Sequence, residues 1–367
     1  MTSPLFSPLK LRELSLSNRI VVAPMCQYSA SDGDVGDWHL IHLGSLSHSG
    51  AGLLIVEATA VAPEGRITPA CTGLWSDANE ASFARILAVI RRYSAMPLGI
   101  QLAHAGRKAS CALPWQGGGQ LPLAAGGWTT VAPSPLPFAD GEAMPTALDA
   151  AGLVRIRKAF VEAARRADRL GFDVVELHAA HGYLLHQFLS PLSNQRADDY
   201  GGSLENRMRF PLEVFDAVRA VWPSGKPLGV RVSATDWVTG GWNADQTVEL
   251  ARALKTRGCD FLHVSSGGLS PLQQIAASPG FQVPFARRVK SETGLATIAV
   301  GLITEPKQAE AIIAEGSADC VALARGILYD PRWPWHAAAE LGAQVEAPPQ
   351  YGRSAPAGAG QLFASAG

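Results

Sequence analysis

Short apolar runs recur along the chain, and a helical pattern follows most of them. The runs are Arg19–Ala23, Leu53–Thr59, Pro97–Ala103, Val174–Ala180, Pro227–Ser233, Phe261–Gly267, Ala296–Leu302 and Cys320–Gly326. Most are apolar at successive positions, which is typical of strands buried on both faces of a parallel sheet. Eight such strands alternating with helices predict a (β/α)8 (TIM) barrel. A doubly wound sheet is the alternative, although the chain has no G-x-G-x-x-G fingerprint and no P-loop.

The segments between the runs carry helix start and stop signals. Asp149 precedes an amphipathic run that ends at Leu170-Gly171. Asp330-Pro331 predicts an N-cap with proline in the first turn of a last helix, over Trp333–Leu341. We therefore assign residues 1–347 to a single barrel domain.

Two stretches fall outside this alternation. Residues 104–148 form a 45-residue excursion after the third strand, rich in Gly, Pro and Trp. Loops of that length are usually functional, so we predict a subdomain that caps the C-terminal mouth of the barrel. The tail at 348–367 is rich in Ala, Gly, Ser and Pro, and we expect it to be mobile beyond Arg353.

The charge balance excludes several classes of partner. Thirty-one basic and thirty-two acidic residues give a net charge of −1, which argues against nucleic-acid and membrane-surface binding. No run of eighteen apolar residues occurs, and Met1–Lys10 lacks a signal-peptide pattern. The five cysteines are scattered without a C-x-x-C pair. We expect a soluble, reduced, cytoplasmic protein with no metal site.

Polar or reactive residues stand at the carboxyl ends of nearly all the runs, where barrels of this class carry their chemistry. They are Cys26 and Tyr28, Glu57, Gln101 and His104, His178, His181 and Tyr183, Arg231, Gly301, and Ala324 with Arg325. Taken singly, Cys26 reads as a small core residue, and the histidines as core histidines. Because polar groups are costly in buried strands, their recurrence at one end predicts a site there.

The same residues narrow the chemistry. No lysine ends a strand, which disfavours Schiff-base catalysis. Gly301 and Ala324-Arg325 follow the last two strands, where barrels commonly bind a phosphate through backbone N–H groups.

Longer motifs resemble the Old Yellow Enzyme family of FMN-dependent ene-reductases, and most closely its thermophilic-like class, typified by YqjM and xenobiotic reductase A. The motifs are Ala23–Tyr28, Val56–Thr59, Gly65–Thr68, Gln101–Lys108, His178–Leu184, Ser190–Asn194, Asp199–Ser203 and Glu205–Arg207. The resemblance extends from about Leu5 to Arg353. It implies an NAD(P)H-dependent enzyme that binds FMN non-covalently and reduces activated C=C bonds in enones, enals, maleimides and nitroalkenes. It favours NADPH, and NADH stays open.

The resemblance also implies residue roles around the flavin. Pro24, Met25, Cys26 and Ala58 line the flavin, Gln101 bonds its pyrimidine edge, Arg231 lies beside N1 and O2, and Gly301, Ala324 and Arg325 bind the phosphate. Cys26 also tunes the flavin and touches the substrate.

A second set of implied roles concerns the substrate. His178 and His181 bind the substrate oxygen, Tyr183 donates a proton, and Tyr28 is a second hydroxyl nearby. Arg353, within residues 350–353, crosses to a neighbouring subunit's site in a homodimer or a tetramer of such dimers. By composition alone, the same tail reads as a frayed terminus. The alternatives in function are another flavin-barrel dehydrogenase and a non-catalytic flavoprotein that senses redox state through Cys26.

Overall fold

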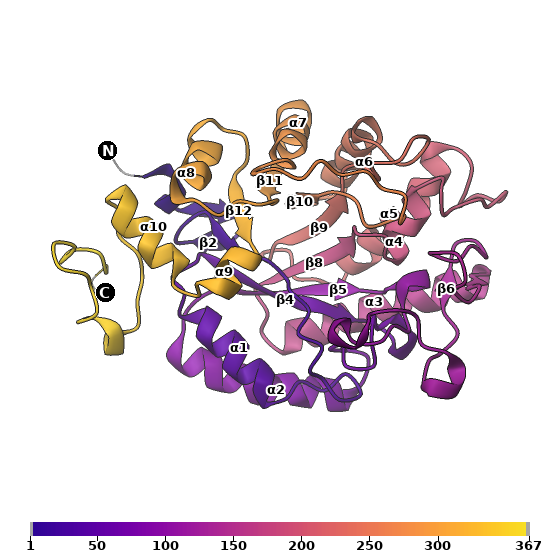
Figure 1. Ribbon diagram of the computed structural model, residues 1–367, viewed down its shortest axis with the longest axis horizontal. Helices are drawn as coiled ribbons and strands as arrows, with labels where there is room; N and C mark the ends of the chain where they lie inside the picture. Colours follow the sequence, from indigo (N-terminus) through magenta and orange to yellow (C-terminus); the bar gives the residue numbers. More distant parts are fainter. Residues whose placement is uncertain (1–2, 365–367) are drawn as a thin grey trace.

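Eight parallel strands form a closed barrel in the computed structural model, which describes residues 3–364 (Figure 1). The strands are β3 (Ile20–Val22), β4 (Leu53–Ala60), β5 (Leu98–Ala103), β8 (Val174–Ala179), β9 (Leu228–Ser233), β10 (Phe261–Ser265), β11 (Ala296–Ala299) and β12 (Cys320–Leu323). They neighbour one another in chain order, and β12 pairs with β3 to close the ring. Each predicted run coincides with one of these strands to within a few residues, so the (β/α)8 barrel is confirmed.

Helices surround the barrel. They are α1 (Asp37–Ser47), α2 (Asp77–Tyr93), α3 (Ala150–Arg169), α5 (Leu204–Arg219), α6 (Ala244–Thr256), α7 (Val283–Thr293), α8 (Pro306–Ala314) and α10 (Trp333–Leu341), with the short α4 (Leu184–Leu189) and α9 (Arg325–Tyr329). Asp149 caps α3 as predicted, because its side chain accepts the N–H of Gly152. The predicted N-cap Asp330 is not the N-cap of α10. Its carboxylate accepts the N–H of Arg332, which is the N-cap, and the helix begins at Trp333 as predicted.

The amino-terminal end of the barrel interior is filled by apolar side chains. Phe261 lies against Gly229, where an added Cβ would stand 2.2 Å from the Phe261 ring. A hairpin of β1 (Leu9–Leu11) and β2 (Leu14–Leu16) contributes Leu11 and Leu16 to the same apolar cluster. This plug leaves the opposite end of the barrel for polar side chains.

The excursion at 104–148 contains only short elements. They are η3 (Gly106–Lys108), η4 (Pro114–Gln116), η5 (Leu123–Ala125), and the paired strands β6 (Val131–Ala132) and β7 (Thr146–Ala147). In Figure 1 this segment lies at the opposite side of the molecule from both chain termini. Its role as a cap over the mouth stays a prediction.

The tail beyond the last barrel helix folds back onto α10. Leu362 is buried, and the ring of Trp335 makes edge contacts with the rings of Tyr351 and Phe363, at centroid distances of 5.9 and 4.9 Å. The described part of the tail therefore packs on α10 through a few apolar side chains gathered around Trp335. Mobility beyond Arg353 stays a prediction.

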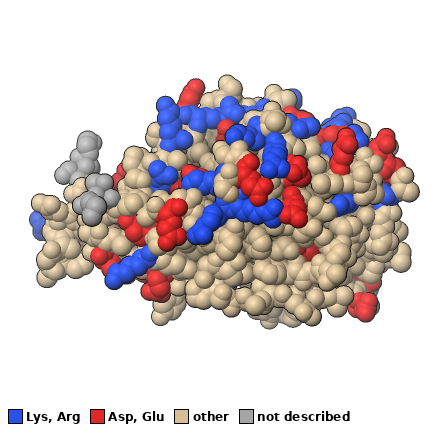
Figure 2. Space-filling model, turned by 90° about the horizontal axis from the view of Figure 1, so that it is seen from above, with Lys and Arg blue, Asp and Glu red and all other residues tan. Residues whose placement is uncertain are grey.

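Charges of both signs are interspersed on the face shown in Figure 2. Ion pairs such as Arg252–Glu292 and Arg288–Asp245 join neighbouring helices. Among the described helices, none is long and apolar enough to cross a membrane.

Candidate active site

The barrel strands bring polar side chains together through their register. Gln101 on β5 pairs with Glu176 on β8, and Arg231 on β9 pairs with both His178 and His263. Residues that pair in a parallel sheet point to the same face, and so do residues two apart on one strand. The barrel therefore places these five side chains in one cluster.

Glu176 lies at the centre of the Glu176 cluster, which we define as Gln101, Glu176, Arg231 and His263. Its Oε1 accepts a hydrogen bond from Gln101 Nε2 at 2.7 Å, and its Oε2 lies 2.9 Å from His263 Nδ1. Burial alone would raise the pKa of Glu176, but His263, Arg231 and Gln101 together hold it below its usual value. Burial and Arg231 lower the pKa of His263. The pair is thus an ionised carboxylate beside a neutral imidazole.

His178, His181 and Tyr183 form a second group, with His178 near the end of β8 and the other two on the chain that follows it. The rings of His178 and His181 stand edge to face with centroids 5.2 Å apart, and Tyr183 is 4.9 Å from His178. Burial, followed by the charge of Arg231, lowers the pKa of both histidines well below the usual value. His178 Nδ1 accepts the N–H of Ala180 at 3.3 Å, so the neutral ring carries its proton on Nε2 and offers it as a donor.

His181 is held in the left-handed region, with φ of 59°. Lys108 Nζ donates to the His181 carbonyl at 2.9 Å and to the Gly268 carbonyl at 2.7 Å. Gly182 must be glycine, because an added Cβ would lie 2.2 Å from the Gly268 oxygen. The His181 ring itself is fixed by Ser265, whose hydroxyl lies 2.8 Å from Nε2.

A second buried pair stands behind this loop. Asp236 and His186 are fully buried, with Oδ1 and Nε2 2.9 Å apart. Asp236 Oδ2 also accepts from the Ser190 hydroxyl at 2.6 Å and from the Trp242 N–H at 2.7 Å. His186 Nδ1 accepts the N–H of Gly182 at 2.9 Å. The Asp236–His186 pair therefore holds the chain between His181 and Tyr183.

Cys26 and Tyr28 lie on the loop after β3. Burial raises the pKa of both groups, and each is further raised by Cys71 and Glu57. Glu57 Oε2 accepts the N–H of Gln27 at 2.9 Å, which ties this loop to β4. Cys26 and Tyr28 also contribute to the raised pKa of Tyr183, so the two loops face the same space.

The remaining predicted residues lie around this centre. Ala58 is buried on β4, and Gly301 adopts a φ of 117° after β11, a region that favours glycine. Arg325, which is exposed, begins α9 immediately after β12. Pro24 and Met25 are half-buried beside Cys26.

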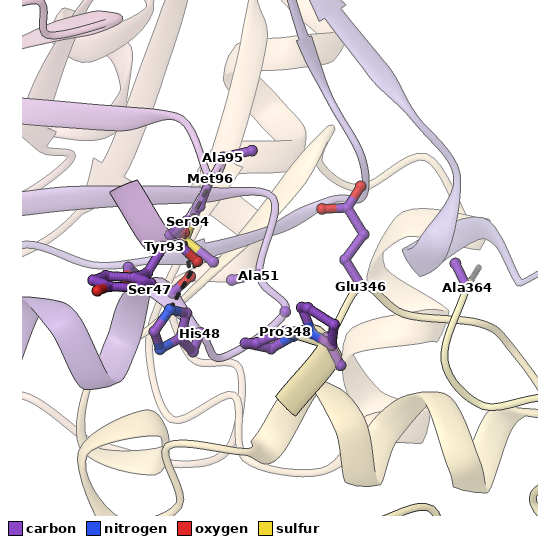
Figure 3. A pocket seen from close by; sticks show the side chains of 13 residues that line it. Ser47, His48, Ala51, Tyr93, Ser94, Ala95, Met96, Glu346, Pro348 and Ala364 are labelled. Atoms are coloured by element: carbon purple, nitrogen blue, oxygen red, sulfur yellow. Dashed lines mark hydrogen bonds between the residues drawn. The ribbon is translucent and has the colours of Figure 1, made fainter. Parts of the chain in front are cut away.

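Arg353 does not join the site of its own chain. It is exposed on the tail, whose Tyr351 packs against Trp335 of α10, and in Figure 1 the tail lies at the opposite side of the molecule from the excursion after β5. Residues 346–349, where the barrel domain meets the tail, line a cavity of about 450 Å³ with residues at the ends of α1 and α2, including His48 and Tyr93 (Figure 3). No strand end contributes to this cavity, so we do not assign the chemistry to it.

Comparison with known proteins identifies the family. A sequence model described as "NADH:flavin oxidoreductase / NADH oxidase family" matches residues 4–344. The chain belongs to this family. It is 45% identical over 355 residues to an NADPH dehydrogenase of Geobacillus thermodenitrificans, with 96% of this chain and 99% of that protein covered. An NADPH dehydrogenase of Bacillus subtilis is 41% identical over the same length, with the same coverage.

Solved structures agree with this family. Morphinone reductase superposes with a TM-score of 0.78 and 30% identity, covering 100% of this chain and 94% of that one. Another neighbour is morphinone reductase in complex with tetrahydroNAD, with a TM-score of 0.76. The chain is thus a flavin oxidoreductase, and membership implies FMN as the cofactor.

The cluster of polar groups fits a flavin. Arg231 is only 7% exposed, and its Nε has no hydrogen-bond partner among the described residues. A buried cation with unused donors is costly unless a ligand accepts from it. Gln101 and Arg231 both act on the Glu176 carboxylate, and Cys26 and Tyr183 are near enough to Arg231 to affect its pKa.

Sequence reasoning assigned no role to five residues that shape the site. They are Glu176, His263, Ser265, His186 and Asp236. A signal for His263 was present, because it interrupts an otherwise apolar strand on the face that also carries Ser265. Asp236 and His186 lie 50 residues apart in sequence, and no local pattern links them.

Proposed function

We propose that this protein is an FMN-dependent NAD(P)H oxidoreductase that reduces activated C=C bonds, an ene-reductase. The observation that carries the proposal is the group of two neutral histidines and a tyrosine beside the buried cation Arg231. The substrates we propose are enones, enals, maleimides and nitroalkenes. NADPH is the favoured reductant, with NADH as the alternative.

We infer the flavin-binding residues from their positions around the Glu176 cluster. Gln101 and Arg231 would bind the pyrimidine edge, with Pro24, Met25, Cys26 and Ala58 lining the ring, and Gly301, Ala324 and Arg325 binding the phosphate. When bound, the flavin supplies hydride from N5 to the β-carbon of the alkene. Arg231 would stabilise negative charge at the pyrimidine edge.

The substrate is polarised by the histidines. His178 Nε2–H and a ring N–H of His181 would donate to the carbonyl or nitro oxygen, which draws electron density from the conjugated bond. Burial raises the pKa of Tyr183 well above its usual value, so the hydroxyl keeps its proton at neutral pH. Tyr183 would deliver that proton to the α-carbon, and Tyr28 supplies a second hydroxyl near the substrate.

Two measurements test the proposal. The purified protein should be yellow, and mass spectrometry of the released cofactor should find FMN rather than FAD. Anaerobic NADPH should bleach the flavin absorption, and cyclohexenone or a maleimide should restore it. A flavin that NADPH reduces but no activated alkene reoxidises would contradict the ene-reductase assignment, while leaving family membership intact.

The redox-sensor alternative is disfavoured by Cys26 itself. The thiolate is the reactive form of cysteine, and burial raises the pKa of Cys26 well above its usual value. The thiol therefore stays protonated at neutral pH. The free cysteines and a requirement for NAD(P)H support a cytoplasmic location as part of the same proposal.

We also propose that the protein is a homodimer, or a tetramer of such dimers. The outer face of α1 exposes Trp38 and Ile41, at 51% and 65%. Trp38 Nε1 donates to Gln27 beside the site, and Arg332 links the last turn of α1 to Tyr351 in the tail. Contacts of α1 thus connect the rim of the site with the tail.

A second copy on that face would bring its own tail to the rim. Arg353, which lies far from its own site, would then complete the partner's pocket with a guanidinium. Arg353→Ala should raise KM without loss of fold, and Ile41→Asp should give a monomer with the same defect. Val154→Asp, on the exposed face of α3, is the control and should change neither. A monomeric wild-type protein with full activity would overturn the assembly proposal.

A further inference from the structure

Glu176 is a buried carboxylate that the proposed reaction does not use. It is fully buried on β8, two residues before His178 and on the same face of the strand. Both its oxygens are engaged, Oε1 by Gln101 and Oε2 by His263. Glutamate is almost never fully buried unless it balances a charge, so the surroundings of Glu176 must contain one.

The balancing charge is that of Arg231. The titratable groups that face the Glu176–His263 pair are Arg231 on β9 and His178 on β8. His178 and His263 are neutral, and Gln101 carries no charge, so Arg231 is the cation of the cluster. A buried arginine alone would give this edge a charge of +1, and Glu176 brings it close to zero.

Glu176 also fixes the orientation of Gln101. Because Gln101 Nε2 donates to Glu176 at 2.7 Å, the amide oxygen is the group left to accept a hydrogen bond from a ligand. A glutamine in place of Glu176 could either donate to Gln101 or accept from it, so the orientation of the Gln101 amide would no longer be fixed. The carboxylate thus acts on the flavin edge through both Gln101 and Arg231.

We propose that Glu176 is a positioning residue of the flavin site, which orients Gln101, opposes the charge of Arg231 and thereby lowers the reduction potential of bound FMN. This rests on the proposed FMN site. Reduction adds negative charge beside Arg231, and a fixed carboxylate in the same buried cluster makes that addition less favourable.

The test is the midpoint potential of the FMN-loaded protein, measured by spectroelectrochemistry. Glu176→Gln keeps the size of the side chain and removes its charge. It should favour the reduced flavin by tenfold or more in the two-electron equilibrium, which is about 30 mV in the positive direction. Asp236→Asn is the matched control, since it neutralises the other buried histidine-paired carboxylate, and it should leave the potential unchanged.

A second variant covers the case in which Glu176→Gln does not fold. His263→Leu removes one donor to Glu176, so the carboxylate pKa rises and the residue takes up a proton when the flavin is reduced. The potential should then fall more steeply with pH than in the wild type. Unchanged potentials in both variants would overturn the inference, and so would a failure of both to fold, which would assign the pair to barrel stability. A wild-type protein that binds no FMN would instead overturn the proposed function.

Discussion

The two buried carboxylate–histidine pairs use the same chemistry in different settings. Glu176 lies on β8 and His263 on β10, the two strands that flank β9, and strand pairing fixes both backbones. Asp236 follows β9, and His186 lies in the short helix α4. The first pair faces the cation Arg231, whereas the second holds a loop through Gly182.

The two pairs therefore have different roles: Glu176 contributes its charge, and the Asp236–His186 pair fixes the geometry of a loop. The barrel already fixes the position of Glu176, so its charge is what remains for it to contribute. The chain from His181 to Tyr183 has no strand to hold it, and it includes a left-handed residue at His181. Asp236 and His186 supply the missing constraint. We therefore expect neutralisation of the first pair to change redox properties, and neutralisation of the second to change stability and loop order.

The largest expected effect is on the stability of the loop pair. Asp236→Asn leaves His186 without its carboxylate, and breaking a buried pair typically costs about 3–5 kcal/mol. Urea denaturation should measure this loss in the free energy of unfolding. An unchanged stability, or a shifted flavin potential, would remove the contrast between the two pairs.

The same variant has a pH signature. Burial would raise the pKa of Asp236, but His186 and the surrounding donors hold it below its usual value. An acid whose folded pKa is depressed stabilises the fold above its unfolded pKa, about 3.9, and this contribution is lost as pH falls through the folded pKa. The stability difference between wild type and Asp236→Asn should therefore shrink below about pH 4.

The second largest effect is expected on the rate of alkene reduction when His178 or His181 is removed. His178→Ala and His181→Ala each remove one N–H from the substrate oxygen, which typically lowers the rate by about a hundredfold or more. Stopped-flow reoxidation of reduced flavin by an enone should show the loss. His48→Ala, in the cavity at the other end of the barrel, is the control. Equal losses in all three variants would contradict the site.

A smaller effect is expected at the proton donor. Tyr183→Phe should slow alkene reduction by roughly tenfold, below the usual range for a general acid because water can reach this half-buried residue. Flavin reduction by NADPH should stay nearly unchanged. Tyr200→Phe, which only loses a contact with Glu213, serves as control. An equal decrease in both half-reactions would show that Tyr183 is not the donor.

The smallest effect is expected at Cys26. Cys26→Ala exchanges one neutral group for another, because the thiol is held protonated. We expect a shift in flavin potential smaller than that of Glu176→Gln, with a change in one half-reaction rate and no unfolding. A large stability loss with an unchanged potential would return Cys26 to a packing role.

The sequence alone determined the barrel and predicted the end at which its site lies. Short runs apolar on both faces are typical of buried strands, and their alternation with capped helices leaves few topologies. The same reasoning placed His178, His181, Tyr183 and Arg231 together, because parallel strands end at one edge. The match to the NADH:flavin oxidoreductase family agrees with the resemblance that those residues carried.

Only the tertiary structure decided which distant residues support this group. Asp236 and His186 meet because the loop after β9 folds onto α4, and the tail lies against α10 because the ring of Trp335 contacts those of Tyr351 and Phe363. Such contacts join segments that are distant in sequence and irregular in backbone. Periodicity reports the burial of one segment at a time, whereas these contacts depend on how separate segments close onto one another in three dimensions.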